Sequence, residues 1–149
     1  MRIAFGCDHR ALGLKKGLVG YATAFGHECA DLGCYGEAPV DYPDIAREVG
    51  KAVAAGQYDK GVLICGTGIG MSMAANRLKE VRAALCHNVF TAGRARQHND
   101  ANVLCLGAEV VDAKTAEQVL LMFLNTNFEG GRHARRLEIM KRLEWRDLP

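Results

Sequence analysis

Apolar residues in this chain form short continuous runs that alternate with segments in which they recur every three or four positions. Short continuous runs are typical of strands buried on both faces of a parallel sheet, and the periodic segments are typical of amphipathic helices. The predicted strands are residues 2–7, 27–32, 61–65, 81–86 and 103–106. Because strands alternate with helices five times, the sequence predicts an α/β protein, a three-layer α/β/α sandwich around a parallel, Rossmann-like sheet.

Residues with special backbone preferences mark where the predicted helices begin and end. Gly26 closes the first helix, Pro43 suits the first turn of the second, and Asn88 is the expected N-cap of the fourth. The helices are expected from Leu14 to Phe25, from Pro43 to Gly56, from Ile69 to Asn76, from Val89 to about Gln97, and from Asp112 to Asn125. Beyond Gly130 and Gly131 a C-terminal basic helix is expected.

The third predicted strand runs directly into a glycine-rich turn, within the stretch Gly61–Gly70 (GVLICGTGIG). Its three alternating glycines leave backbone N–H groups free to face an anion at the start of a helix. Cys65 and Thr67 are the reactive groups of this turn. A thiol at the carboxyl end of a strand and beside a helix N-terminus is expected to have a lowered pKa. A small buried cysteine in a tight turn is the alternative, but it does not account for all three glycines.

Composition and charge narrow the class of protein. The chain has 149 residues, of which 49% are hydrophobic and 24% are charged, as is usual for one globular domain of residues 1–149. A net charge of +2, with no aromatic residues interleaved among basic ones, falls short of a nucleic-acid binder. Small-molecule chemistry is therefore expected, with no nucleic acid as a partner.

Neither a membrane nor a secretory pathway is predicted. The first residues have too short an apolar run for a signal peptide, and no run of eighteen apolar residues occurs. The six cysteines include no C-x-x-C pair, and most fall in predicted strands, so disulfides and a zinc site are not expected. The sequence therefore predicts a cytoplasmic protein without a membrane partner.

Two histidines are candidates for proton transfer because each follows a predicted element on a polar segment. Asp8 and His9 come directly after the first strand, and strands one and three should lie side by side, which brings both residues against Cys65. His98 lies on a polar loop that is expected at the same end of the sheet, where an ordinary histidine pKa suits proton transfer. His27 is interpreted as structural.

The basic tail offers a candidate phosphate site. Arg132 and Arg136 are four residues apart and share one helix face. The spacing is equally consistent with two other roles for this face. Its arginines could form ion pairs with Glu129 and Glu138, or the face could be a solvated basic surface.

Other classes of protein also place a cysteine in such a loop. A low-molecular-weight phosphatase needs an arginine six positions after the cysteine, but that position is Met71, so this class is excluded. A cysteine phosphocarrier of sugar transport stays an alternative, although its loop follows the first strand rather than the third. A non-catalytic sugar-phosphate binding module would have no need of Cys65 and His98 together.

Five motifs, taken together, resemble those of the type B ribose-5-phosphate isomerases, whose relatives include galactose-6-phosphate isomerase subunits. They are Gly6–His9 (GCDH), Asp41–Pro43 (DYP), Cys65–Gly70 (CGTGIG), His98–Asn102 (HNDAN) and Gly130–His133 (GGRH). The resemblance runs from the first strand to the basic tail. Some relatives lack the cysteine and others the His-Asn pair, so a chain that has both resembles the ribose enzymes.

The resemblance implies an aldose-ketose isomerase that interconverts ribose 5-phosphate and ribulose 5-phosphate through an enediolate, without a cofactor or metal. It implies that Cys65 is the base, that Thr67 and the loop N–H groups stabilise the enediolate, and that His98 with Asp8 opens the sugar ring. The implied substrate-binding residues are His9, Asp41, Tyr42, Gly66, Gly68, Ile69, Gly70, Asn99, Arg132 and Arg136. His9 and the two tail arginines would hold the phosphate.

A homodimer, or a dimer of dimers, with shared active sites is also implied. The tail of residues 130–149 and the His98 segment would then pack against the partner subunit's glycine loop. The tail helix has apolar residues to bury, which are Leu137, Ile139, Met140 and Leu143.

One position departs from the pattern of the resemblance. Many relatives have an arginine where this chain has Glu109, and that arginine helps to bind phosphate. Three explanations would account for the acid. Arg94 or Arg135 compensates for the missing arginine, phosphate binding is weaker, or the substrate is another one, such as allose 6-phosphate, galactose 6-phosphate or a tetrose phosphate.

Overall fold

The computed structural model describes residues 1–143, and five parallel strands form its one sheet in the order β2-β1-β3-β5-β4. The strands are β1 (Arg2–Cys7), β2 (Glu28–Asp31), β3 (Lys60–Cys65), β4 (Ala83–Leu85) and β5 (Val103–Gly107). The predicted parallel sheet and the adjacency of β1 and β3 are confirmed. β4 is shorter than predicted because it is an edge strand that pairs only with β5 among the described strands.

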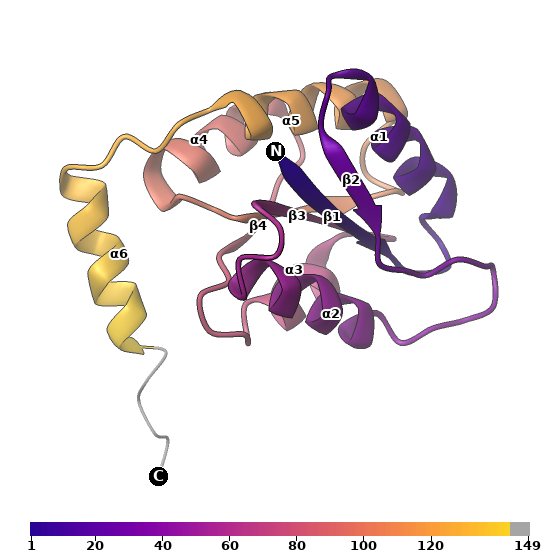
Figure 1. The fold of residues 1–149 in the computed structure, drawn as a ribbon, viewed down its shortest axis with the longest axis horizontal. Coiled ribbons are helices and arrows are strands. Elements are labelled where there is room, and N and C mark those ends of the chain that lie inside the picture. The colour runs from indigo at the N-terminus through magenta and orange to yellow at the C-terminus, as the bar shows by residue number, and fades with distance from the viewer. Residues whose placement is uncertain (144–149) are drawn as a thin grey trace, which may run out of the picture.

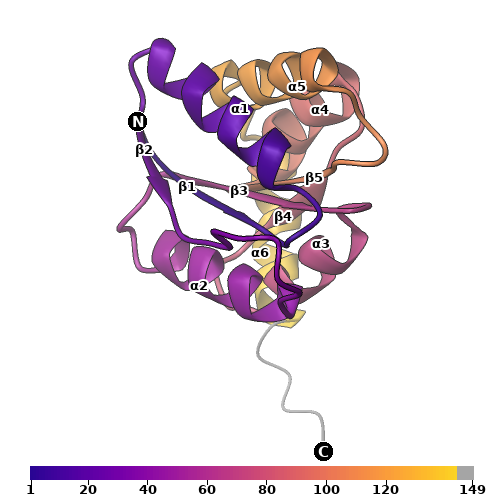
Figure 2. The ribbon, with the colours of Figure 1, turned by 90° about the vertical axis from the view of Figure 1, so that its right-hand side faces the viewer.

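Helices cover both faces of the sheet, which confirms the three-layer sandwich (Figures 1 and 2). One layer contains α1 (Leu12–Ala24), α4 (Val89–Asn99) and α5 (Ala113–Asn125). The other contains α2 (Tyr42–Ala54) and α3 (Ile69–Ala75). The layers form because the strands are apolar on both faces, so that each face needs a cover.

The alternation of side chains along β3 decides which layer the candidate cysteine faces. Val62 and Ile64 pack into the cluster under α1, α4 and α5, whereas Leu63 and Cys65 pack into the cluster with α2 and α3. Leu63 and Ile64 are fully buried. Cys65 therefore ends a strand that both layers hold in place.

The basic tail forms α6 (Arg132–Leu143), as predicted, and α6 stands beside α4, away from the sandwich (Figure 1). Leu137 is buried against the rest of the chain, but Ile139, Met140 and Leu143 are each at least 45% exposed. The last part of the tail, residues 144–149, lies outside the described residues. Within one chain, α6 thus leaves much of its apolar surface uncovered.

Candidate active site

Cys65 is held inside the glycine loop by the backbone around it. Its Sγ accepts a hydrogen bond from the Gly68 N–H at 3.1 Å, and the residue is 6% exposed. The Ala108 N–H donates to the Cys65 carbonyl at 2.9 Å, which ties the loop to the end of β5. A sulfur that accepts from a backbone N–H is stabilised as a thiolate, the form that acts as a base.

Two of the loop glycines are required by space. Gly68 has φ +76°, and a Cβ there would lie 2.6 Å from Leu85 Cδ1 and 2.8 Å from the Leu106 carbonyl carbon. A Cβ on Gly70 would lie 2.6 Å from the ring of Tyr42. The loop is therefore packed between β4, β5 and the start of α2, and the predicted site residue Tyr42 lies directly on it.

The end of β1 supplies the next two predicted residues. Cys7 lies opposite Ile64 in the parallel register, and the Asp8 N–H donates to the Ile64 carbonyl at 3.0 Å. This places the buried Asp8 next to the strand end that carries Cys65. The Nδ1 of His9 accepts from the Val40 N–H at 3.3 Å, so the Nε2 carries the proton of the neutral ring.

Thr67, Ile69 and Asp41 complete this part of the site. Thr67 and Ile69 are exposed on the loop, and the Thr67 Oγ1 accepts from the Ile69 N–H at 3.4 Å. Asp41 is exposed at the N-cap position of α2 and makes no side-chain capping bond. The side chains of Thr67 and Asp41 therefore leave polar atoms exposed at the carboxyl end of the sheet.

The expected position of His98 was wrong. α4 continues to Asn99, so that His98 and Asn99 lie in its last turn, and Asp100 ends the helix with a left-handed backbone of φ +43°. α4 runs from the carboxyl end of β4 back to the amino end of the sheet, where the Gly61 N–H donates to the Asn102 carbonyl at 2.9 Å. His98 therefore lies at the opposite end of the sheet from Cys65, and β3 alone separates the two ends by roughly 16 Å.

His98 belongs to a cluster with residues at the start of α6. The rings of His98 and His133 stack with centroids 4.1 Å apart and an interplanar angle of 7°. Glu129 Oε2 lies 3.8 Å from His98 Nε2 and 3.6 Å from His133 Nε2. On its other side each Nε2 meets an arginine, Arg94 Nη1 at 3.3 Å from His98 and Arg132 Nε at 3.4 Å from His133.

We call this group of residues the histidine cluster (Arg94, His98, Glu129, Arg132 and His133). An arginine only donates, and the Arg132 Nε–H group donates to His133 Nε2. Burial, together with the neighbouring His98 and Arg132, lowers the pKa of His133 below its ordinary value. The other tail arginine, Arg136, is exposed one turn further along α6.

The two histidines and Glu129 are the candidate metal ligands among the described residues, since their ligand atoms lie within 4.8 Å of one another. Their geometry does not suit a metal, because an ion must lie in the plane of each imidazole and these rings are stacked face to face. Two guanidinium groups also point at the same nitrogen atoms. The cluster is suited to bind an anion instead.

Glu129 and Glu138, the alternative partners of the tail arginines, have other partners in the structure. Glu129 faces the two histidines, and Glu138 pairs with Lys141 at 3.3 Å. The sequence prediction gave His133 no role, and helical spacing could not have revealed its contact with Glu129, because Glu129 precedes α6.

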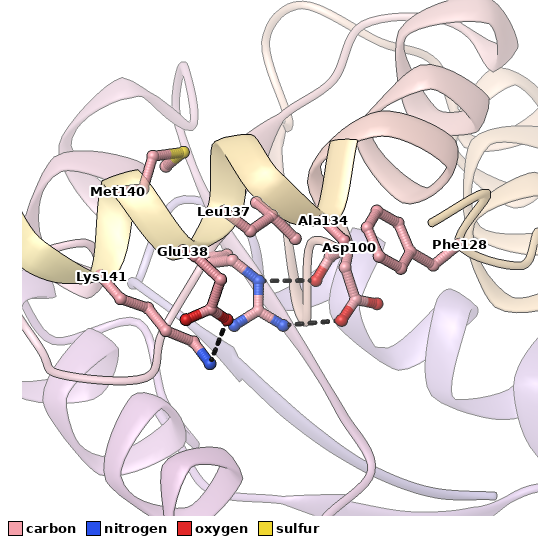
Figure 3. A pocket seen from close by; sticks show the side chains of 8 residues that line it. Asp100, Phe128, Ala134, Leu137, Glu138, Met140 and Lys141 are labelled. Carbon is pink, nitrogen blue, oxygen red and sulfur yellow. Dashed lines mark hydrogen bonds and ion pairs between the residues drawn. The ribbon is translucent and has the colours of Figure 1, made fainter. Parts of the chain in front are cut away.

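Beneath α6 lies a pocket lined by Leu137, Met140, Asp100, Phe128 and neighbouring side chains (Figure 3). Arg82 also lines this pocket, and its Nη2 donates to Asp100 Oδ2 at 2.9 Å. This pocket opens between α6 and the amino end of the sheet, far from Cys65, so it is not a second approach to the thiol.

The pattern that defines the ribose/galactose isomerase family matches residues 3–140 of this chain, which therefore belongs to that family. The chain is 43% identical to ribose-5-phosphate isomerase B of Escherichia coli K12 over 97% of both chains. It resembles the structure of ribose-5-phosphate isomerase B from Clostridium thermocellum, with a TM-score of 0.96 and 42% identity over 97% of each chain. The same enzyme from Mycoplasma genitalium, solved with bound ribulose 5-phosphate, gives a TM-score of 0.93 and 43% identity over 97% of each. Within residues 1–143, no helix is both long and apolar enough to cross a membrane.

Proposed function

We propose that this protein interconverts ribose 5-phosphate and ribulose 5-phosphate, with Cys65 as the base that moves a proton between C2 and C1. The observation that carries this proposal is the Cys65 Sγ at a strand end, hydrogen-bonded to a backbone N–H within the glycine loop. Membership of the ribose/galactose isomerase family supports the reaction class. The names of the similar enzymes support the five-carbon substrate.

The chemistry of the loop suits an enediolate. Removing the C2 proton places negative charge on the sugar oxygens, and donors that are already in position lower the barrier for that step. The loop N–H groups and the Thr67 hydroxyl would be such donors, apart from the Gly68 N–H, which donates to Cys65 Sγ, and the Ile69 N–H, which donates to Thr67 Oγ1. Asp41 and Tyr42 lie at the same end of the sheet and would line the sugar pocket, and Asp8 would take part with His98 in opening the sugar ring.

A second subunit would complete the site. Cys65 and the histidine cluster lie at opposite ends of the sheet, so one chain alone does not bring His98, Asn99 and the tail arginines to the thiol. In the proposed homodimer, the partner subunit's His98 opens the sugar ring at the Cys65 loop, and its Arg132 and Arg136 hold the phosphate together with His9. The exposed apolar face of α6 supports this assembly, because it needs a cover.

An assay of aldose phosphates with four, five and six carbons tests the proposed substrate. The highest kcat/KM is expected for ribose 5-phosphate. Glu109 is the observation that favours a second candidate, an isomerase of another aldose phosphate, because it replaces an arginine of the family pattern. A kcat/KM at least ten times higher for a tetrose or hexose phosphate would select that candidate, and covalent phosphate on Cys65 would select the phosphocarrier class instead.

A further inference from the structure

Glu109 does not stand alone at the carboxyl end of the sheet, because its carboxylate forms an ion pair with Arg10 Nη2. Arg10 follows His9 in the turn after β1, and Glu109 follows the end of β5. The pair thus joins the turns after two strands that flank β3 on either side. Arg94, which was considered as the compensating arginine, instead contacts Gln97 and His98 at the other end of the sheet.

Both members of the pair lie against the first glycine of the loop. A Cβ on Gly66 would lie 3.4 Å from Arg10 Cζ and 3.2 Å from Glu109 Oε1. Gly66 directly follows Cys65, so the guanidinium is held beside the candidate base. A Cβ at Gly66 would therefore be in tight contact with both members of the pair.

Backbone bonds fix the two turns from which the pair projects. The Arg10 N–H donates to Asp8 Oδ1 at 3.0 Å, and the Glu109 N–H donates to the Gly66 carbonyl at 2.9 Å. These bonds tie Arg10 to Asp8, a proposed catalytic residue, and tie Glu109 to the glycine loop. The position of the guanidinium is therefore set by the same backbone that positions Cys65.

The pair is too exposed to be explained by stability. The side chains of Arg10 and Glu109 are 56% and 50% exposed, and ion pairs at such exposure contribute little to folding. A guanidinium has five N–H donors, and one carboxylate leaves some of them for a second acceptor. An arginine held in place with unused donors is suited to bind a phosphate.

We propose that Arg10 contacts the phosphate of the substrate and that Glu109 holds its guanidinium in position over Gly66. This inference rests on the proposed function, since it places a sugar phosphate at the Cys65 loop. It adds a cation from the same subunit as the thiol, next to His9, to those of the partner subunit's tail. Glu109 then positions a cation, and its own charge is neutralised by that cation.

The test uses Arg10→Gln, Glu109→Gln and a matched control, Arg2→Gln. Arg2 lies at the other end of the same strand, is 46% exposed and pairs with Asp59 at 2.9 Å, so it reproduces the charge and exposure without the site. The Kd of inorganic phosphate is measured by calorimetry on each folded protein, and KM and kcat are measured with ribose 5-phosphate.

Arg10→Gln should weaken inorganic phosphate binding about tenfold or more, which is typical of a lost hydrogen bond to a charged group. Its KM should rise in parallel while kcat stays within threefold. Glu109→Gln should change the Kd less than threefold, because the amide oxygen still accepts from Arg10, and Arg2→Gln should match the wild type.

Two outcomes would overturn the proposal. An unchanged Kd in Arg10→Gln would show that Arg10 does not meet the phosphate. A loss in Arg2→Gln equal to that in Arg10→Gln would show that the weaker binding reflects the lost surface charge and not a contact with the phosphate. The phosphate measurement needs no turnover, so it decides the role of Arg10 even if the wild type fails to isomerise ribose 5-phosphate, a result that would reject the proposed function separately.

Discussion

The glycine loop after β3 and the histidine cluster between α4 and α6 both bear candidate catalytic residues, but they are built in different ways. The loop is packed among three strands and a helix, and its key groups are backbone N–H donors and one nearly buried thiol. The histidine cluster consists of side chains from two helix ends, held by ring stacking and by contacts with arginines. The first site is thus built mainly from packed backbone, and the second carries two arginines, Arg94 and Arg132.

This difference indicates how the work of the reaction is divided. Proton abstraction needs a base and donors that are fixed relative to each other, which packed backbone provides. Phosphate binding and ring opening need charge and a titratable group, which helix ends can present to another molecule. In the proposed dimer, the glycine loop of one subunit meets the histidine cluster of its partner. The predictions below test this division, from the largest expected effect to the smallest.

Removing the base should have the largest effect. Cys65→Ala is expected to reduce kcat by ~100 to 10,000-fold, as is usual when a general base is lost, and to leave sugar-phosphate binding nearly unchanged. The matched control is Cys86→Ala: burial raises the pKa of Cys86 to about 11, so this thiol stays protonated near neutral pH. Steady-state kinetics check both variants. Activity within tenfold of wild type in Cys65→Ala would reject Cys65 as the base.

His98 should matter for only part of the reaction. Ribulose 5-phosphate cannot form a furanose ring, because its C5 oxygen is esterified, so exchange of its C1 hydrogen with solvent needs no ring chemistry. His98→Asn is expected to keep this exchange while turnover of the cyclic aldose falls by ~100-fold or more, a typical value for a lost acid-base group. Exchange is followed by NMR in heavy water. Equal losses of exchange and isomerisation would place His98 in the enolisation step itself.

Mixing two damaged subunits tests whether the two regions meet across a dimer. Cys65→Ala and Arg136→Ala are each expected to be nearly inactive. A symmetric dimer that contains one of each would have one doubly damaged site and one intact site. If random reassociation makes half of the dimers mixed, about a quarter of the wild-type activity should return. Mixed dimers without recovered activity would show that Arg136 and Cys65 serve the same subunit's site.

The comparison also explains what could be predicted from the sequence. The order of strands β1 and β3 and the placement of Asp8 beside Cys65 could be predicted, because parallel strands bring their carboxyl ends to one edge. The place of His98 could not, because α4 continues two residues beyond the predicted end at Gln97 and stops only at the left-handed Asp100. The Arg10–Glu109 pair joins positions 99 residues apart, and no local pattern reports such a contact. The untested roles of the site residues stay predictions.

The smallest expected effect concerns the pH dependence of the histidine cluster. The pKa of His133 is lowered in the folded protein by burial and by the nearby His98 and Arg132, whereas an unfolded histidine titrates near ~6.5. As the pH falls from about 7.5 through that range, the unfolded chain takes up a proton that the folded chain resists, so stability falls.

His133→Gln should therefore lose less stability between about pH 7.5 and 5.5 than the wild type, in urea unfolding at a fixed protein concentration. His87→Gln, which changes an exposed histidine outside the cluster, should keep the wild-type dependence. Parallel pH curves for His133→Gln and the wild type would mean that His133 takes up its proton as readily in the folded protein as in the unfolded chain.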